Sequence, residues 1–502
     1  MTRRVRTGTL LTLPLNTRTN APLFRQLYEA LQRSILDGTL PRGVRLPATR
    51  GLAEELGVSR NTVMNAYEQL LAEGYLEGKV GSGTYVPRTL PEEMIQVREP
   101  PRQMRPAPRK RPPLSRRGEV LAGNAKLAAS SVYMPRPFRA GIPALDAFPF
   151  ETWMRLVARH HRRPPRDLLS YGDPAGYAPL RRAIAAHLGP ARAVHCDPEQ
   201  VVVLTGAQQG LDLIARVLLD PQDSAWMEDP GYPSARAALQ GAAIRLVPVP
   251  VDTEGLDVAA GNARCPDARL VYVTPSHQYP LGVTMSLSRR LALLDWARRA
   301  KAWVVEDDYD SEFRFAGRPL AAMQGLDRDG RVIYMGTFSK TLFPSLRLGY
   351  LVVPPDLVEA FVASRSVIDR QTATLTQAVV ADFLNEGHFL RHIRRMRTLY
   401  RERQETLVRA AKREMGGELE VCPGETGLHV MGWLCEKWDD RQASHAATEA
   451  GVKATPLSSY CIEPHERGGL MLGFGAYDSR QIRDSIRRLA SALRSHNRLR
   501  PL

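Results

Sequence analysis

The sequence predicts an α/β protein with two parts, a small winged helix-turn-helix and a large domain built on a mostly parallel sheet. Three observations support this prediction. Apolar residues recur at helical spacing within about the first 90 residues and stop at glycine-containing turns. Beyond about residue 135, short apolar strands alternate with helical segments. The chain has 502 residues, which is enough for two or more domains.

The charge of the chain is unevenly distributed. The formal net charge is +16, and more than half of this excess lies within the first 120 residues. A basic excess at one end predicts a polyanion partner, and nucleic acid is favoured over a membrane because no basic amphipathic anchor helix is evident. A basic surface that only confers solubility is the alternative.

Cysteine usage and hydropathy exclude several classes of protein. None of the five cysteines forms a CxxC pair, so the sequence indicates neither a disulfide framework nor a metal site. No apolar run approaches the ~20 residues that span a bilayer. The N-terminus also lacks the apolar core and cleavage site of a signal peptide. We therefore expect a cytoplasmic, nucleoid-associated protein with no metal and no membrane partner.

The first 87 residues predict a winged helix-turn-helix. Helical spacing indicates a first helix through Leu23, Leu27, Leu31 and Ile35. A second helix covers residues 50–56, and Ser59 follows the Gly57-Val58 turn as the cap of a third. The inward face of this third helix carries Val63, Tyr67, Leu70 and Leu71. LEGKVGSGTYV then predicts two short strands around a glycine-rich tip, which is a wing. A helical hairpin without DNA-binding function is the alternative.

The DNA contacts are expected on the third helix and on the wing. The third helix begins with Arg60, Asn61 and Thr62, where a recognition helix meets base edges and phosphates, and the wing carries Lys79. The stretch LPATRGLAEELGVSRNTVMNAYEQLLAEGYLEGKVGSGTYV also resembles the GntR-type winged helix. This resemblance implies DNA contacts at Arg50, Arg60, Thr62 and Gly81.

Residues 88–130 predict a linker. The segment is rich in Pro and Arg, as in REPPRQMRPAPRKRPP, and has little apolar periodicity. Such a composition favours an extended, semi-stiff spacer, and binding of its basic run to phosphate is the alternative. The large domain is then expected over residues 131–502.

Four segments of the large domain begin as buried strands and end in polar residues: VVVLTGAQQG, LVYVTPSHQYPLG, WVVEDDYDSEF and RVIYMGTFSK. In mostly parallel sheets, ligands gather at the carboxyl ends of the strands. Gly206-Ala207-Gln208 opens a helix and favours a phosphate, to which Thr337, Ser339 and Arg347 add donors. Asp307 and Tyr309 lie two apart, so a strand directs both to one face.

These groups, together with the ring of Tyr232 and the amine of Lys340, suit pyridoxal 5′-phosphate (PLP). The order along the chain supports this prediction: a phosphate turn, an aromatic residue, YPLG, DDY, SK and then an arginine. Each motif by itself is weak, because a lysine after a serine is usually a surface residue. The combination predicts a PLP site.

Residues from about 135 to 495 resemble fold type I aminotransferases, and the whole chain resembles the MocR/GabR family of PLP-dependent transcriptional regulators. This resemblance implies that Lys340 forms the internal aldimine, Asp307 pairs with the pyridine nitrogen, Tyr309 binds the phenolic oxygen and Tyr232 stacks on the ring. The phosphate would be bound by Gly206, Ala207, Gln208, Thr337, Ser339 and Arg347. Tyr171 would reach the cofactor of the partner subunit in a homodimer. Aminotransferase spacing would instead select Glu306 as the acid, but strand alternation turns Glu306 away from Tyr309.

Two positions depart from the aminotransferase pattern. Tyr279 stands where an asparagine precedes the turn, and Met471 stands where an arginine is expected to bind the substrate carboxylate. Methionine cannot supply such a fork of donors, and Arg467 is the alternative. We therefore expect the effector to be a different amine, an amino acid held otherwise, or PLP itself.

The sequence thus predicts a PLP-dependent DNA-binding transcriptional regulator that senses its effector through Lys340. A catalytically active aminotransferase with an accessory DNA-binding module is the alternative, and residual transaminase activity is compatible with both. A homodimer presents two winged helices, which predicts an operator with two half-sites on double-stranded DNA.

Overall fold

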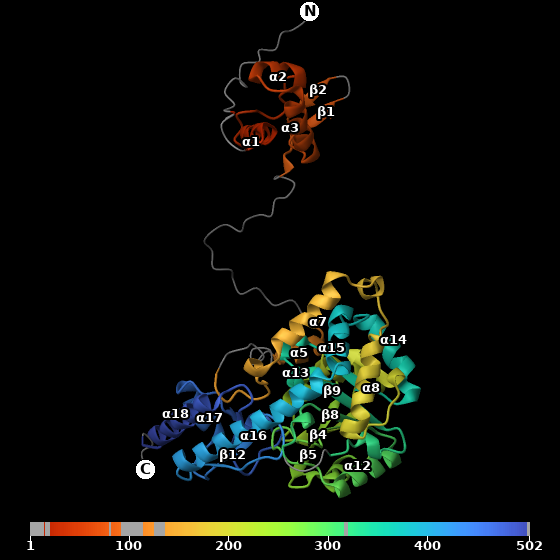
Figure 1. Ribbon diagram of the computed structural model, residues 1–502, viewed down its shortest axis with the longest axis vertical. Coiled ribbons are helices and arrows are strands. Elements are labelled where there is room, and N and C mark those ends of the chain that lie inside the picture. The colour runs from red at the N-terminus through yellow and green to blue at the C-terminus, as the bar shows by residue number, and fades with distance from the viewer. Residues whose placement is uncertain are drawn as a thin grey trace, which may run out of the picture. The chain divides into compact units, whose positions relative to one another are not determined.

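The computed structural model describes residue 15 and residues 21–79, 82–91, 114–124, 136–315 and 320–498, with the side chains of the last helix described up to residue 495. The chain divides into two compact units, Met1–Pro112 and Pro113–Leu502. Figure 1 colours both units by residue number. The predicted linker is described only at residues 88–91 and 114–124, so its boundaries remain predictions.

The first unit is a winged helix. Its elements are α1 (Leu23–Leu36), α2 (Thr49–Leu56), α3 (Arg60–Ala72), β1 (Glu77–Lys79) and β2 (Gly83–Tyr85). The two strands pair antiparallel, as a wing requires. Leu27, Leu31 and Ile35 of α1 pack into one apolar cluster with residues of α2, α3 and the segments that flank the wing. Gly81, at the wing tip, lies outside the described residues.

The ends of the helices follow the predicted signals. Gly57 ends α2 in the left-handed conformation, and the Ser59 side chain accepts from the Thr62 amide at 3.1 Å, as an N-cap does. One predicted core position is wrong. Leu71 is 37% exposed, and Ala66 is buried instead, because the inward stripe of α3 runs through Val63, Ala66, Tyr67 and Leu70.

A short helix, α5 (Arg116–Gly123), lies inside the predicted linker. It begins where the proline-rich stretch ends, and Ser115 caps it by accepting from the Gly118 amide at 3.0 Å. Helix α5 contacts α10 (Pro233–Gly241), and the side chain of Leu121 lies against Gly241. These eight residues are therefore helical rather than extended.

The second unit is built on an eight-stranded sheet in the order β3-β10-β9-β8-β7-β4-β5-β6. Neighbouring strands from β9 to β5 are parallel, whereas β10 pairs antiparallel with β3 and β9, and β6 pairs antiparallel with β5. The mostly parallel sheet is thereby confirmed. The strands are β3 (Val201–Leu204), β4 (Ser224–Asp229), β5 (Arg245–Asp252), β6 (Gly255–Leu256), β7 (Leu270–Val273), β8 (Trp303–Asp308), β9 (Val332–Thr337) and β10 (Gly349–Val352).

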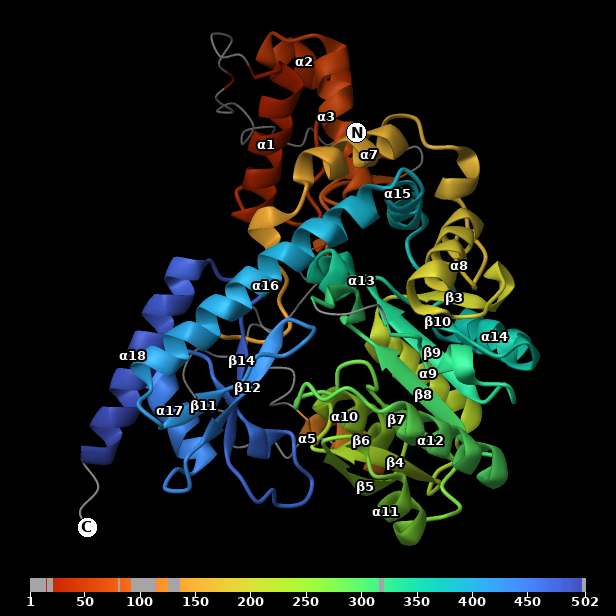
Figure 2. The same ribbon diagram turned by 60° about the horizontal axis from the view of Figure 1, so that its bottom comes forward.

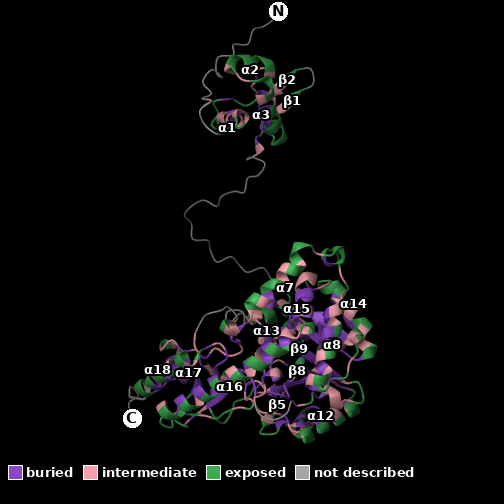
Figure 3. Ribbon diagram, viewed as in Figure 1, coloured by how far each residue is buried: buried purple, intermediate pink, exposed green. Residues whose placement is uncertain are grey.

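Helices cover both faces of this sheet, so its strands are buried and the outer helix surfaces are exposed (Figure 3). One face packs on α9 (Ala207–Leu218), α10 and α14 (Val358–Ile368). The other face packs on α7 (Phe150–Arg162), α8 (Ala178–Arg192), α11 (Val258–Arg264), α12 (Leu287–Ala300), α13 (Phe338–Thr341), α15 (Thr374–Asn385) and α16 (His388–Glu414). Successive strand residues alternate between the two faces.

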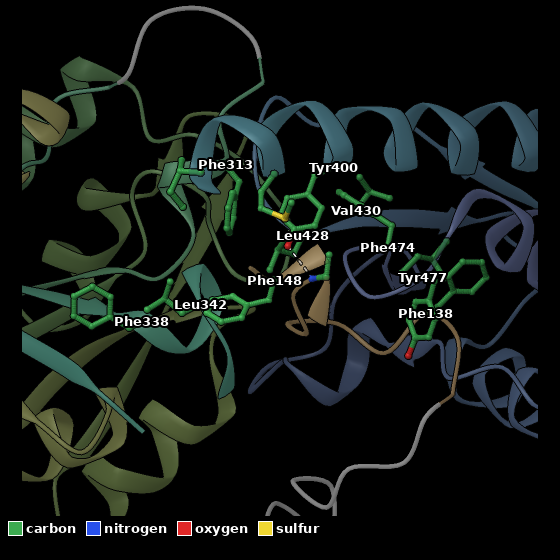
Figure 4. Packing of buried hydrophobic residues seen from close by; sticks show 14 of the residues in the cluster. Phe138, Phe148, Phe313, Phe338, Leu342, Tyr400, Leu428, Val430, Phe474 and Tyr477 are labelled. Carbon is green, nitrogen blue, oxygen red and sulfur yellow. Dashed lines mark hydrogen bonds between the residues drawn. The ribbon is translucent and has the colours of Figure 1, made fainter. Parts of the chain in front are cut away.

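A smaller antiparallel sheet, in the order β11-β12-β14-β13, follows near the C-terminus. Figure 2 shows the long helix α16 running from α15 along the small sheet, next to α18. Aromatic and aliphatic residues fill the space beside α16, and the Tyr400 hydroxyl accepts from the Ala144 amide at 2.9 Å (Figure 4). The elements are β11 (Leu419–Val421), β12 (His429–Leu434), α17 (Asp440–Glu449), β13 (Thr455–Pro456), β14 (Gly469–Gly473) and α18 (Ser479–Arg498).

Within the described part of the chain, no helix is both long enough and apolar enough to cross a membrane.

Candidate functional site

Lys340 lies on α13, directly after the carboxyl end of β9. Its Nζ donates to the carbonyl oxygen of Gly141 at 2.8 Å, which brings the loop before α7 against the lysine. Burial lowers the pKa of Lys340 from its ordinary value, and the nearby carboxylates of Asp310 and Asp307 act in the opposite direction. A lysine with a lowered pKa has more of the neutral amine that a nucleophile needs.

Asp307 lies near the end of β8, on the face that carries Tyr272 of β7. Its Oδ2 accepts from the Tyr272 hydroxyl at 2.6 Å, whereas its Oδ1 is buried and has no hydrogen-bond partner among the described residues. Burial raises the pKa of Asp307 to about 7, and the bond from Tyr272 opposes that rise. The second oxygen is therefore suited to a cationic N–H donor.

Glu306 lies on the opposite face of β8. Both of its oxygens accept backbone amides, from Met323 at 2.8 Å and from Gln324 at 2.9 Å. This carboxylate therefore holds the chain segment at Met323 in place. Of the two acids considered from the sequence, Asp307 is the one with an oxygen left for a ligand.

The structure brings together Gly206 and Arg347, two of the residues predicted to bind a phosphate. Gly206, at φ 128°, precedes α9, and a Cβ atom on it would lie 3.0 Å from a terminal guanidinium nitrogen of Arg347. The absence of a side chain therefore lets the guanidinium approach the start of α9. The α9 N-terminus and Arg347 together offer the donors and the positive charge that a phosphate requires.

The other predicted phosphate contacts have mixed side-chain roles. Thr337 Oγ1 accepts from the Ser339 amide at 3.2 Å, which shapes the turn that carries Lys340. The side chain of Gln208 donates instead to the carbonyl oxygen of Ser234 at 3.0 Å. Gln208 would therefore contribute its backbone N–H to an anion site, and Ala207 would do the same.

Tyr232 and Tyr309 both lie next to Tyr279. The ring of Tyr279 meets Tyr232 edge to face at 5.3 Å and Tyr309 at 5.8 Å. Strand β8 ends at Asp308, so Tyr309 lies just beyond it, and its hydroxyl donates to the carbonyl oxygen of His277 at 2.9 Å. Burial raises the pKa of Tyr309 well above its ordinary value. Tyr279 is thus the aromatic centre of the site.

Sequence reasoning missed a buried His–Asp–His group beside these tyrosines. The candidate ligand atoms of His277, Asp310 and His429 all lie within 4.8 Å of one another. His277 Nδ1 lies 3.0 Å from Asp310 Oδ1, and the rings of His277 and His429 are 4.8 Å apart. The histidine in TPSHQYPLG and the last aspartate in DDYD were visible signals. Nothing in the sequence indicated that His429 would join them.

Tyr171 does not lie in the site of its own subunit. Its side chain is 80% exposed, and the guanidinium of Arg370 lies 4.8 Å from its ring centroid. The exposed position leaves the predicted contact with a partner subunit untested.

The two departures from the aminotransferase pattern lie in one apolar cluster. Met471 of β14 is buried opposite Met431 of β12, and Tyr279 packs against the cluster that contains them. Arg467 donates to Glu420 at 3.0 Å and to the carbonyl oxygen of Leu434 at 3.3 Å. These contacts hold Arg467 at the far end of β12 from His429, roughly 16 Å along a six-residue strand.

Comparison with known proteins covers both units. Residues 23–86 match the family of bacterial regulatory proteins of the gntR type, and residues 138–471 match aminotransferase class I and II. The chain is 44% identical over 480 residues to a probable rhizopine catabolism regulatory protein, MocR, of Rhizobium meliloti, covering 96% of this chain and 95% of that protein. The chain belongs to the MocR family of transcriptional regulators.

Another MocR-type relative is the pyridoxine biosynthesis regulator PdxR of Corynebacterium glutamicum, which is 33% identical over 96% of this chain and 98% of its own length. Among solved structures, the multiple substrate aminotransferase of Thermococcus profundus matches with a TM-score of 0.70 and 28% identity, over 77% of this chain and 98% of that protein. Aminotransferases of this class depend on PLP. The regulator prediction is confirmed and is favoured over the aminotransferase alternative.

In this MocR-family regulator the predicted DNA contacts are largely exposed. Arg50, Arg60, Asn61 and Lys79 are exposed, and Thr62 is half-buried because its hydroxyl lies 2.8 Å from Ser59 Oγ. The ion pairs of Arg50 with Glu54 and of Lys79 with Glu77 are exposed. Such pairs are weak and easily exchanged for phosphate. Arg45, which is also exposed, has its guanidinium against Gly83 of the wing.

Proposed function

We propose that this MocR-family regulator binds PLP at Lys340 and that a small amine acting there changes its affinity for operator DNA. The observation that carries the proposal is the buried Oδ1 of Asp307, which has no partner among the described residues and belongs to a carboxylate close enough to Lys340 for the lysine's charge to lower its pKa. A buried acceptor without a donor is costly, so its presence supports a ligand with a donor at that point. The protonated pyridine nitrogen of PLP is such a donor.

Each remaining part of the cofactor has a matching group in the chain. The start of α9 and Arg347 would hold the phosphate, and Tyr232 would cover the ring. Tyr309 would place its hydroxyl at the phenolic oxygen, and Asp307 would hold the proton on the ring nitrogen. When bound, PLP supplies an aldehyde that condenses reversibly with primary amines. Lys340 is the amine at that place in the free regulator, and its lowered pKa favours the condensation.

Borohydride reduction tests this proposal. We expect PLP-treated protein to absorb visible light and to retain the cofactor after reduction, with the added mass on the peptide that contains Lys340. Lys340→Ala should lose the reduced adduct completely, whereas Lys301→Ala, which changes a surface lysine, should keep it. Wild-type protein that stays colourless and cannot be reduced with PLP present would contradict the proposal.

The acid assignment has its own matched pair of variants. Asp307→Ala should weaken PLP retention about a hundredfold, because it removes the partner of a buried charge. Glu306→Gln should instead lower folding stability, since both oxygens of Glu306 bind backbone amides, and should leave PLP affinity within a few-fold of wild type. Equilibrium dialysis at several PLP concentrations measures both. The reverse pattern would assign the pyridine contact to Glu306.

We propose a homodimer in which Tyr171 completes the partner's site. Its ring is exposed, and Leu169 of the same segment and Val367 of α14 are 64% and 88% exposed. Burial of such side chains between two copies is favourable, and a two-fold dimer places two winged helices on two half-sites. Light scattering at sub-micromolar concentration tests this. A stable monomer that still binds PLP and operator DNA would refute it.

The same protein can be tested for turnover. A regulator should change its operator affinity when an amine is added, without steady conversion of an amino donor and a keto acceptor. Gel shifts with amine and PLP, run beside a keto-acid consumption assay, separate the two functions. Sustained turnover with no change in DNA affinity would favour the aminotransferase.

A further inference from the structure

The residues around Lys340 also indicate which chemical class of effector the site accepts. This inference rests on the proposed function. Aminotransferases bind the substrate carboxylate with an arginine, and the resemblance to them implies that Met471 stands at that position here. Met471 pairs with Met431 across the small sheet and shares one apolar cluster with Tyr460, and Tyr279 packs against this cluster. Ala140 belongs to the same cluster and precedes Gly141, whose carbonyl oxygen accepts from Lys340. This apolar and aromatic cluster, which we call the apolar wall, therefore begins at Ala140, one residue before the Gly141 carbonyl that Lys340 contacts.

His429 offers a hydrogen-bond acceptor at this wall. Its Nε2 lies 3.2 Å from the carbonyl oxygen of Pro280, and because a carbonyl oxygen only accepts, Nε2 carries the proton. Nδ1 therefore presents a lone pair, and no described residue donates to it. Burial lowers the pKa of His429 well below its ordinary value, so the ring is neutral. His429 and Met431 lie two apart on β12 and share its face.

Asp310 makes the same region unfavourable for an anion. The two carboxylate oxygens of Asp310 lie 3.0 and 3.1 Å from His277 Nδ1, and the Asp310 side chain is almost fully buried. Asp310 is the charge that most strongly raises the pKa of Lys340, so its field reaches the amine. A carboxylate on an effector held next to Lys340 would meet this like charge at low dielectric.

Three arginines must be considered as carboxylate anchors. Arg467 is held by Glu420 and the Leu434 carbonyl, and Arg347 lies at the start of α9. Arg139, two residues before Gly141, also lies close enough to influence the pKa of Lys340. Of these three described arginines, Arg139 is the one whose charge is felt at Lys340 without a role already assigned above, and so it becomes one arm of the test.

We propose that the effector is a primary amine that carries a hydroxyl group, rather than a carboxylate, near the nitrogen, and that the hydroxyl donates to Nδ1 of His429. The neutral acceptor, the buried Asp310–His277 pair and the apolar wall at Met471 all favour a donor over an anion. His429 is then a specificity-determining residue of the regulator.

Serinol, L-serine and isopropylamine form a matched set of probes. Serinol is serine with its carboxylate replaced by a second hydroxymethyl group, and isopropylamine has neither substituent. We expect PLP-loaded wild-type protein to bind serinol at least about tenfold more tightly than either of the others, because one neutral hydrogen bond is worth about this factor and the anion is repelled. The shift in cofactor absorbance on titration measures all three, and calorimetry provides a second reading.

Two variants of His429 isolate its contribution. His429→Phe removes the acceptor and should reduce the preference for serinol over isopropylamine from about tenfold to about twofold. His429→Gln retains an acceptor and should keep at least half of that preference. Retention of the borohydride-reduced adduct at Lys340 shows that each variant has folded. A preference for serinol that survives in His429→Phe would overturn the proposal.

The result with L-serine separates this inference from the proposed function. If no adduct forms at Lys340, the proposed function fails. If the adduct forms but serine binds as tightly as serinol, and Arg139→Gln removes that affinity, then the effector is acidic and Arg139 is its anchor. The inference is then wrong while the proposed function stands.

Discussion

The winged-helix unit and the aminotransferase-like unit use their functional residues in opposite ways. Arg50, Arg60 and Lys79 of the first unit are exposed and are presented by two neighbouring helices and one hairpin. Around Lys340 the functional groups are buried and come from distant segments: Lys340 contacts Gly141, and Asp307 contacts Tyr272. Exposed charges attract DNA at little folding cost, whereas buried ones cost stability until a ligand compensates them.

The largest effect is expected at Asp307, where burial raises the pKa from 3.8 to about 7. Between these pH values the folded PLP-free protein holds a proton that the unfolded chain releases, so stability falls as pH rises through this range. Asp307→Asn should not lose stability in this way, because asparagine does not ionise. We expect the variant's advantage over wild type to grow from near zero at pH 4 to as much as about 4 kcal/mol above pH 7.

Urea denaturation at several pH values measures this difference. All six tryptophans lie beyond residue 150, so their fluorescence reports unfolding of the large unit alone. PLP should reverse the order of the two proteins, because the ring nitrogen then pairs with the ionised carboxylate. An advantage of Asp307→Asn that does not change with pH would contradict the assigned environment.

A smaller effect is expected at Gly427, beside the His277–Asp310 pair. Gly427 has φ +87°, and a Cβ atom there would lie 2.1 Å from His277 Cε1 and 2.8 Å from Asp310 Oδ2. Gly427→Ala should therefore cost about 3 kcal/mol of stability, through backbone strain and overpacking. Gly416 also has positive φ but has open space around its Cβ position, so Gly416→Ala should cost only about 1 kcal/mol. Equal losses of unfolding free energy for Gly427→Ala and Gly416→Ala in urea denaturation would show that His277 and Asp310 move aside at little cost.

The first unit was predictable because its signals are local. Helical spacing, the Ser59 cap and the Gly57 turn all act within a few residues, and only Leu71 was placed on the wrong side. In the second unit, strand alternation correctly separated Asp307 from Glu306, since two residues on one strand suffice for that argument. The bond from Tyr272 to Asp307 and the place of His429 depend on how distant strands align. No local pattern contains that information.

At the exposed surface, Arg60 should show an intermediate effect on DNA binding. Arg60 is the first residue of α3, where a bidentate contact with a base edge is worth about 1–3 kcal/mol. Arg60→Ala should lose that amount on the operator and discriminate less at the contacted base pair, with unchanged folding stability. Arg25→Ala, at an exposed position of α1, is the matched control and should bind as wild type does. Gel shifts with an operator and its single-base variants decide this. Equal losses for both variants would mean that Arg60 acts only through its charge.

The smallest effect is expected at Lys79 on the wing. Its Nζ lies 3.3 Å from Glu77 and 5.0 Å from the centroid of the Tyr85 ring, and the side chain is exposed. A phosphate contact there is independent of sequence, so Lys79→Ala should weaken operator and unrelated DNA alike, by about 1 kcal/mol or less at 0.15 M salt. The slope of log K against log salt should become shallower by about 1, since one phosphate fewer is neutralised. Glu77→Gln should act in the opposite direction, because it releases Lys79 and removes a charge that repels DNA. Fluorescence anisotropy across a salt series measures both variants, and a change in base preference for Lys79→Ala would show that the wing reads sequence rather than phosphate.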